Sequence, residues 1–171
     1  NMETLASGSI DGFIMSLSKE TQQKRDFHHI KEVINQGMPV VMFDRVTNDI
    51  LCDKVIIDDS LSAFNATQFL INKGYKKIAL ISTVDYVSVG KFRTEGYVNA
   101  IGNSELTYDE NLILKIEDIN NFENEIKDLL IKNKPDAVFA VNEIFAVTAI
   151  KQAAKLGIKV PEELAVIGFT D

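Results

Sequence analysis

The sequence predicts an α/β protein built from parallel sheets that are flanked by helices. Short, continuous apolar runs alternate with amphipathic segments along the chain, and continuous apolar runs are typical of strands covered on both faces. Gly37, Gly74 and Gly157 follow three of the amphipathic segments, at the position where helices commonly end in a left-handed residue. This alternation of strands and helices indicates parallel sheets with helices on both faces.

The strands are expected at the short apolar runs, and the helices where apolar residues recur with helical spacing. Asp58, Asp59 and Ser60 precede one helix and are interpreted as its start, since a side-chain oxygen there can accept from free N–H groups. The predicted strands are 12–16, 40–44, 54–57, 77–82, 112–116, 136–141 and 164–168. The predicted helices are 25–36, 60–73, 89–102, 120–132 and 143–156.

Composition and charge exclude several classes of protein. The formal net charge is −7, and no basic stripe could neutralise a row of phosphates, so these residues are not expected to bind nucleic acid by themselves. Cys52 is the single cysteine, which excludes an intrachain disulfide and favours the reducing cytoplasm. We find no signal sequence and no apolar run long enough to span a bilayer, so no membrane contact is expected.

The sequence lacks the motifs of a phosphate loop, a dinucleotide site or a nucleophilic enzyme. Gly90, Gly96 and Gly102 are too widely spaced for a dinucleotide fingerprint and lie within a predicted helix. His28 and His29 are adjacent, so we expect them on different faces of a solvated helix, unable to share a metal. Because both histidines lie on this helix, no Ser–His–carboxylate set can be assembled. We therefore expect no metal, no cofactor and no enzymatic activity.

Polar residues stand where predicted strands end, and ligands of parallel α/β sheets bind at the carboxyl ends of the strands. Arginine offers a rigid fork of donors, aspartate accepts from hydroxyls, and asparagine can do both. This set suits a sugar or a similar polyol-like or anionic small molecule. A helix cap or turn is the alternative role for each, especially for Asn142. The strand-end residues are Asp44, Arg45, Ser82, Thr83, Asn142, Glu143, Thr170 and Asp171, and Arg93 joins them from the predicted helix 89–102.

Several segments together resemble the effector-binding core of the LacI/GalR family of bacterial transcriptional regulators. Their combination and spacing are specific, and they cover nearly all of 8–171. The resemblance implies a periplasmic-binding-protein-like fold of type I, with two lobes and the ligand between them. The segments are IDGFIMS, GMPVVMFDR, VIIDDSLSAFNATQFLINKGYKKIALIS, FRTEGYVNAI and KPDAVFAVNEIFAVTAIKQAAKLGIKVPEELAVIGFTD.

The resemblance also implies a domain organisation. Residues 1–57 would form part of the N-terminal lobe, and residues 58–171 most of the C-terminal lobe. The N-terminal lobe would be incomplete, and operator DNA would be bound only through a missing N-terminal domain. The family member would be a homodimer, with helix 143–156 a candidate for part of the interface, although its apolar stripe is expected to be core. That stripe is Ile144, Val147 and Ile150.

An incomplete N-terminal lobe would leave a sheet edge or face uncovered. Exposed edges and apolar patches recruit other chains, so these 171 residues are not expected to form a stable monomer. The residues expected near the uncovered edge or face are Ile14, Val40, Val41, Ile56 and Ile57.

Ligand contacts of the family carry over to this chain by position. Asp44 matches the aspartate that ends the PVV strand, Arg93 the arginine of the Arg–x–x–Gly helix, and Asn142 the polar residue after the DAVFAV strand. Thr170 and Glu143 stand where many members have aspartate, and these departures weigh against a plain hexose as ligand. Further candidates are Arg45, Thr83 and Asp171.

Three functions compete at this point. The leading hypothesis is the effector-binding domain of a LacI-family regulator, in which a sugar or sugar derivative shifts the equilibrium of attached DNA-binding heads. The alternative is a periplasmic or surface sugar-binding protein of an uptake system. A sugar-modifying α/β enzyme is the third reading, and it lacks a paired acid and base. An upstream helix-turn-helix would favour the regulator, and a signal peptide the uptake protein.

Overall fold

The computed structural model describes residues 10–118 and 120–169 and divides the chain into two compact units. Unit 1 comprises the described residues up to Ile57 together with Tyr86–Val89. Unit 2 comprises Asp58–Asp85 and the described residues from Gly90 onward. The division lies between Ile57 and Asp58, and Tyr86–Val89 belongs to unit 1. The assignment of 1–57 and 58–171 to two lobes stays a prediction.

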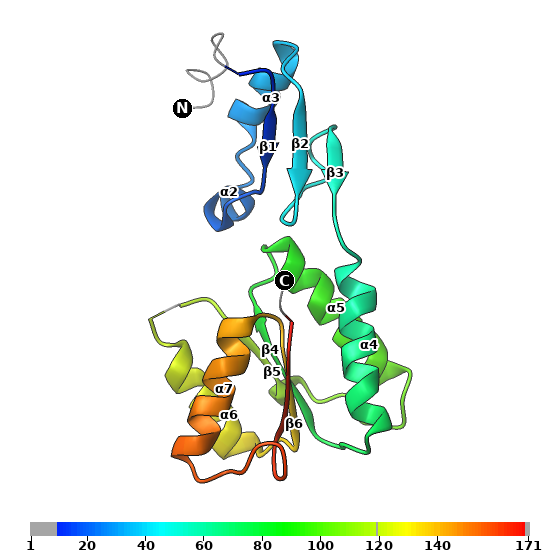
Figure 1. Cartoon of the computed structure of the whole chain (residues 1–171), viewed down its shortest axis with the longest axis vertical. Coiled ribbons are helices and arrows are strands. Elements are labelled where there is room, and N and C mark those ends of the chain that lie inside the picture. Colours follow the sequence, from blue (N-terminus) through cyan, green and yellow to red (C-terminus); the bar gives the residue numbers. More distant parts are fainter. Residues whose placement is uncertain (1–9, 119, 170–171) are drawn as a thin grey trace. The chain divides into compact units, whose positions relative to one another are not determined.

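Unit 1 is a three-stranded parallel sheet with helices against one face (Figure 1). The strands lie in the order β1-β2-β3, and the side chains that point toward the helices form a small apolar core. The elements are β1 (Phe13–Met15), α2 (Lys19–Lys24), α3 (His28–Asn35), β2 (Val40–Phe43) and β3 (Asp53–Val55). The core residues are Leu17, Phe27, Ile30, Val33, Val40, Met42 and Ile50.

The other face of the unit 1 sheet carries exposed apolar side chains. Ile14 is paired with Val41, and Phe43 with Val55, and these residues share a face because side chains alternate along a strand. Ile14 is 80% exposed and Val55 67%. Of the side chains expected near an uncovered edge or face, Ile14 and the two that follow β3, Ile56 and Ile57, are exposed. Val40, in contrast, is buried in the core. Self-association through this unit stays a prediction.

Unit 2 is a three-layer structure around a parallel sheet in the order β5-β4-β6-β7. Helices α4 and α5 cover one face of the sheet, and α6 and α7 cover the other (Figure 1). The central strands β4 and β6 are almost wholly buried, as the continuous apolar runs predicted, and the parallel α/β fold is confirmed. The strands are β4 (Ile78–Thr83), β5 (Ile113–Ile116), β6 (Ala137–Ala140) and β7 (Ala165–Gly168). The helices are α4 (Asp59–Asn72), α5 (Ser88–Gly102), the 3-10 turn η1 (Glu110–Leu112), α6 (Phe122–Asn133) and α7 (Glu143–Lys155).

One helix of unit 1 was not predicted. The sequence suggested a helix over 25–36, whereas α2 precedes it and α3 begins only at His28. Ser18 caps α2 by accepting from the N–H of Thr21 at 3.0 Å, and Arg25 ends it in a left-handed conformation with φ 51°. The sequence signal was weak because α2 has only six residues, most of them polar.

Glycines end three of the helices as predicted. Gly37, Gly74 and Gly157 have φ values of 85°, 93° and 74°, which residues with a Cβ rarely adopt. Asp58, also predicted as a helix start, is the N-cap of α4, and its carboxylate accepts from the N–H of Leu61 at 2.9 Å. These local signals correctly marked the ends of three helices and the start of α4.

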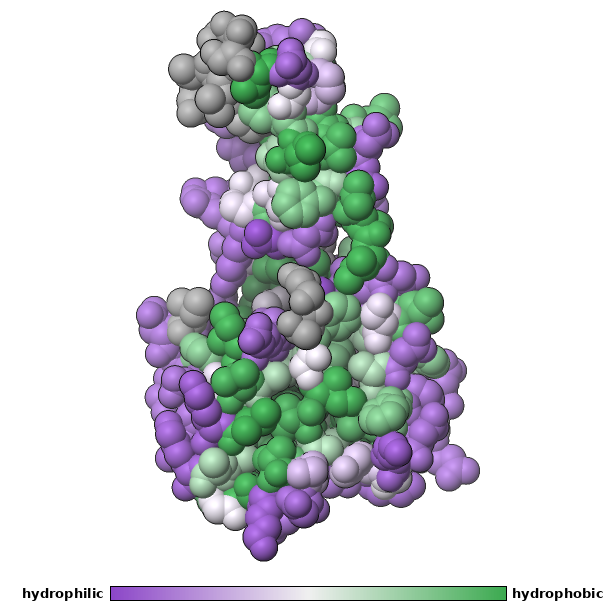
Figure 2. Space-filling model, viewed as in Figure 1, coloured by the Kyte–Doolittle hydropathy of each residue, from purple (hydrophilic) through white to green (hydrophobic). Residues whose placement is uncertain are grey.

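The apolar stripe of α7 does not lie in the core, contrary to the prediction. Ile144 is 60% exposed, and Val147 and Ile150 are about 40% exposed. Figure 2 shows hydrophobic side chains gathered on the face of unit 2 along which α7 and β7 run. The prediction was wrong because α7 has a second apolar face that packs on the sheet. That buried face includes Phe145, Ala146, Ala149 and Ala153.

Helices α4 and α5 approach each other closely at Gly96. A Cβ at this position would collide with the carbonyl oxygen of Ser60 and would lie 2.8 Å from the Cβ of Ala63. The next residue, Tyr97, donates its hydroxyl to the carbonyl oxygen of Ile78 in β4 at 2.7 Å, and burial raises its pKa well above the usual range. The two residues fix α5 against α4 and β4.

We predict that Gly96→Ala lowers the free energy of unfolding by about 2 kcal/mol, because an overpacked contact typically costs 1–3 kcal/mol. Gly102→Ala is the matched control at the end of the same helix, where a Cβ meets open space. It should leave stability unchanged or raise it by up to about 1 kcal/mol, since alanine is the better helix former. Urea unfolding followed by circular dichroism measures both variants, and equal stability of the two would contradict the prediction.

Candidate functional site

The polar residues of unit 2 gather at the carboxyl ends of its strands, around the side chain of Arg93. We call this region the carboxyl edge of unit 2. It is formed by the ends of β4, β6 and β7 and by the first turns of α4, α5 and α7. Its described residues are Asp59, Ser82, Thr83, Arg93, Val141, Asn142 and Phe169.

Arg93 is held from three sides. Its Nε donates to Oδ1 of Asp59 at 2.7 Å, and Nη1 donates to the carbonyl oxygen of Val141. The guanidinium also lies over the ring of Phe169, with Cζ 3.6 Å from the ring centroid. An arginine has five N–H donors, and three of them have no hydrogen bond to the described residues. Arg93, a predicted ligand residue, is therefore buried and held in one position, and three of its N–H donors are not used by the described residues.

Asp59 is the residue of this site that the sequence interpretation missed. It was assigned to a helix start, but Asp58 is the N-cap and Asp59 is free to pair with Arg93. Both partners are nearly buried, with side-chain exposures of 9% for Arg93 and 6% for Asp59. The first turn of a helix also favours a negative charge. The second acid after the capping one was a signal that Asp59 need not cap the helix, but it did not indicate Arg93 as the partner.

The end of β4 provides two hydroxyls with different surroundings. Ser82 is fully buried, and its Oγ lies 2.9 Å from Oγ1 of Thr94 and 3.3 Å from the carbonyl oxygen of Gly90. Oγ1 of Thr83 is buried as well but has no hydrogen-bond partner among the described residues. A Cβ at Gly90 would collide with this Oγ1. The structure thus explains Ser82 as a packing residue, whereas the buried hydroxyl of Thr83 has no hydrogen bond to the described residues.

Asn142 has the capping role that was given as its alternative. Its Oδ1 accepts from the N–H of Phe145 at 2.8 Å and caps α7, which leaves the two donors of Nδ2. Glu143 follows in the first turn of α7 and is exposed. Thr170 and Asp171 lie outside the described residues, so their predicted role stays a prediction.

Unit 1 carries the remaining predicted residues, Asp44 and Arg45, directly after β2. Asp44 has a left-handed backbone with φ 57°, and its Oδ2 accepts from Oγ of Ser16 at 3.4 Å. Nε of Arg45 donates to the same Oγ at 3.3 Å and lies 3.5 Å from Oδ2 of Asp44. The structure therefore brings both predicted residues together with Ser16, which the sequence interpretation did not name. Their contact with a ligand stays a prediction.

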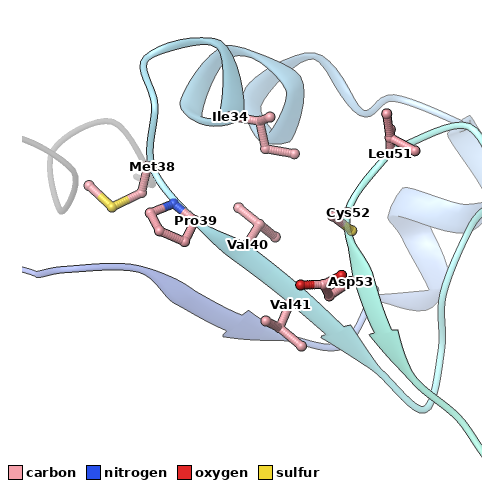
Figure 3. A pocket seen from close by; sticks show the side chains of 8 residues that line it. All are labelled: Ile34, Met38, Pro39, Val40, Val41, Leu51, Cys52 and Asp53. Carbon is pink, nitrogen blue, oxygen red and sulfur yellow. The ribbon is translucent and has the colours of Figure 1, made fainter.

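Each unit has a cavity at the amino ends of its strands, whereas the predicted site residues lie at the carboxyl ends. The unit 1 cavity, of about 350 Å³, lies beside the start of β2, and Asp53 is its one acidic side chain (Figure 3). The unit 2 cavity, of about 480 Å³, lies at the start of β6 and the end of α6. Apolar side chains dominate the lining of both. Neither cavity offers the convergent donors and acceptors that a sugar requires.

The histidines of α3 differ from the expectation in one respect. His28 and His29 are exposed, as predicted, but their rings are in edge contact with centroids 5.7 Å apart. Together with Glu32 they offer ligand atoms that all lie within 4.8 Å of one another. The argument that adjacent histidines cannot share a metal was therefore wrong for this helix start. The three are solvent-facing, and His28 Nδ1 lies 3.7 Å from the carboxylate of Glu32.

Over residues 10–118 and 120–169, none of the helices has both the length and the apolar character needed to cross a membrane.

Comparison with known proteins gives a match along the chain. A family model described as "periplasmic binding proteins and sugar binding domain of LacI family" matches residues 1–171. The transcriptional regulator DegA of Bacillus subtilis is 30% identical over 96% of this chain and 49% of its own length. This chain thus spans about half the length of the curated relatives that it matches.

Two solved structures share the fold and were determined with ligands. A sugar-binding transcriptional regulator of the LacI family from Escherichia coli, complexed with phosphate, is 25% identical with a TM-score of 0.81. The match covers 99% of this chain and 60% of that one. The regulator CelR in complex with cellobiose is 27% identical with a TM-score of 0.82, and the match covers 97% of this chain and 50% of that one.

The two hydroxyls at the end of β4 should respond oppositely to removal. Ser82→Ala deletes a buried hydrogen-bonded hydroxyl and should lower the free energy of unfolding by about 1–2 kcal/mol. Thr83→Val replaces an unpaired hydroxyl and should leave stability unchanged or raise it by up to about 1 kcal/mol. Thermal and urea unfolding compare the variants, and a greater loss for Thr83→Val than for Ser82→Ala would refute this assignment.

Proposed function

The chain belongs to the family of periplasmic binding proteins and LacI sugar-binding domains, and from this premise we propose that it is the effector-binding part of a transcriptional regulator. Its effector is a sugar or a sugar derivative. Binding shifts an equilibrium between two conformations and so alters the affinity of attached DNA-binding domains for their operator. The names of the matched relatives support a regulator over a solute-binding protein of an uptake system.

The observation that carries this proposal is the fixed position of Arg93. Beside its contacts to Asp59, Val141 and Phe169, three of its N–H donors have no hydrogen bond to the described residues at the carboxyl edge of unit 2. Nδ2 of Asn142 and the hydroxyl of Thr83 add polar groups at the same edge. Donors held in one geometry suit the closely spaced hydroxyls of a sugar, because little conformational entropy is lost on binding.

Several further features of the protein belong to the same proposal. Operator DNA is bound by a helix-turn-helix domain outside these 171 residues, and the net charge of −7 supports this division of roles. The protein acts in the cytoplasm, where its DNA is. It binds its effector without chemical conversion, a proposal supported by the described residues of the site, among which we find no pair of an acid and a base suited to catalysis.

We also propose that the protein is a homodimer and that α7 forms part of the interface. Its exposed stripe of Ile144, Val147 and Ile150 is apolar, and two copies can pack such a stripe against itself around a two-fold axis. Exposed apolar patches of this kind commonly mark interaction surfaces.

The effector site is tested by a thermal-shift screen of sugars followed by calorimetry with Arg93→Lys. A ligand at a hundredfold excess over Kd should stabilise the protein by about 2.7 kcal/mol. Arg93→Lys keeps the charge but loses the planar fork of the guanidinium. The binding free energy should therefore weaken by about 1.5–3 kcal/mol, as is typical for the loss of a charged hydrogen bond. Arg25→Lys, at an exposed pair with Asp49, is the control and should bind normally. Unchanged affinity in Arg93→Lys and in Arg93→Ala would remove Arg93 from the site.

The dimer is tested by placing a charge on the α7 stripe. Ile144→Asp and Val147→Asp should convert the dimer to monomers in sedimentation velocity, because an unpaired carboxylate is costly in a buried interface. Phe69→Asp, an equally drastic change at an exposed position of α4, should leave the dimer intact. Dissociation by all three variants, or by none, would argue against α7 as the interface.

A further inference from the structure

The charge of Arg93 is already balanced before any ligand binds. Nε of Arg93 and Oδ1 of Asp59 are 2.7 Å apart, and both side chains are nearly excluded from water. Such a pair interacts far more strongly than an exposed one, because little solvent screens it. An anion that approached Arg93 would therefore meet a neutral pair and would lie close to the carboxylate of Asp59.

The other cations near the carboxyl edge of unit 2 also have acidic partners. Nζ of Lys115, near the end of β5, lies 2.5 Å from the carboxylate of Asp85. Nζ of Lys91, on the first turns of α5, lies 3.9 Å from the carboxylate of Glu95. Glu143 adds a negative charge in the first turn of α7. The described charges at this edge thus supply no excess positive charge for a phosphate or a carboxylate.

The uncommitted groups at the same edge are suited to hydroxyls. Three N–H donors of Arg93 and two of Asn142 have no hydrogen bond to the described residues. Oγ1 of Thr83, which is buried and unpartnered, can donate as well as accept. Donors beside a group that does both match a ligand hydroxyl, which also donates and accepts. A phosphate at neutral pH offers mostly acceptors and brings a charge of between −1.5 and −2.

We infer that Asp59 is a specificity-determining residue that restricts the effector to uncharged polyhydroxyl compounds and excludes their phosphorylated forms. This inference rests on the proposed function, because it concerns the ligand of the same site. Asp59 acts in two ways. It balances the positive charge of Arg93. It also accepts a hydrogen bond from Nε and so orients the guanidinium, which leaves donors on the two terminal nitrogens for the ligand.

The test uses inorganic phosphate as the probe, so it does not depend on knowing the effector. Thermal denaturation is recorded in phosphate and in chloride at equal ionic strength for the wild type, Asp59→Asn and Asp128→Asn. Asp59→Asn keeps the shape and leaves the charge of Arg93 unbalanced. Its phosphate affinity should exceed that of the wild type at least tenfold, and the gain should vanish in Asp59→Asn combined with Arg93→Met. Asp128→Asn removes a carboxylate from the exposed pair with Lys132 on α6, which the inference does not involve, and should behave like the wild type.

Two results would overturn the inference. One is phosphate binding by the wild type that is lost in Arg93→Met, and the other is a folded Asp59→Asn protein without any gain in phosphate affinity. If Asp59→Asn does not fold even in phosphate, the test compares the affinities of the wild type for a neutral sugar and for its phosphate. Suitable pairs are glucose with glucose 6-phosphate and ribose with ribose 5-phosphate. Tighter binding of a sugar phosphate than of its neutral partner contradicts the inference. Tighter binding of the neutral sugar supports it. Failure of every neutral sugar to bind would instead count against the proposed function, while the phosphate comparison still tests Asp59.

Discussion

The buried ion pair between Arg93 and Asp59 joins most of the elements that form the carboxyl edge of unit 2. It connects α5 to α4, and the further contacts of the guanidinium reach Val141 after β6 and Phe169 after β7. A buried pair adds little net stability, because desolvation offsets much of the attraction, whereas the loss of one partner leaves an uncompensated charge and typically costs 3–5 kcal/mol. The main effect of the pair is therefore to fix positions. It holds one planar group of donors at the point where three strands end.

The placement of Arg93 depends in turn on packing further along α5. Residues three and four positions apart share a helix face, so Gly96 and Tyr97 lie on the same side of α5 as Arg93. Gly96 allows α5 to touch the backbone of α4, and Tyr97 anchors the helix to β4 through the carbonyl oxygen of Ile78. The position of the guanidinium of Arg93 is thus a consequence of close helix packing, and the same face of α5 carries both the packing residues and the buried arginine.

The sequence was sufficient for the fold because its signals are local. Continuous apolar runs marked the buried strands, and Gly37 and the capping Asp58 marked helix ends. The site was predictable only in part. Arg93 was named from the polar residues near the strand ends and again from the resemblance, but the choice of Asp59 as its partner depends on how α4 meets α5, which no local pattern encodes. The exposed face of α7 was missed for a related reason: a helix with two apolar faces does not reveal which one packs on the sheet. The short polar helix α2 had too few residues for a periodic signal.

Gly90 and Thr83 are coupled by the lack of space between them. Position 83, at the end of β4, can change to a smaller residue without a collision. A Cβ at position 90, in contrast, requires a smaller residue at position 83. The two positions should therefore covary among proteins of this fold, with glycine retained at position 90 wherever a β-branched residue occupies position 83. Substitution at position 90 is thus conditional on position 83, so an evolutionary path that replaces this glycine must alter position 83 first.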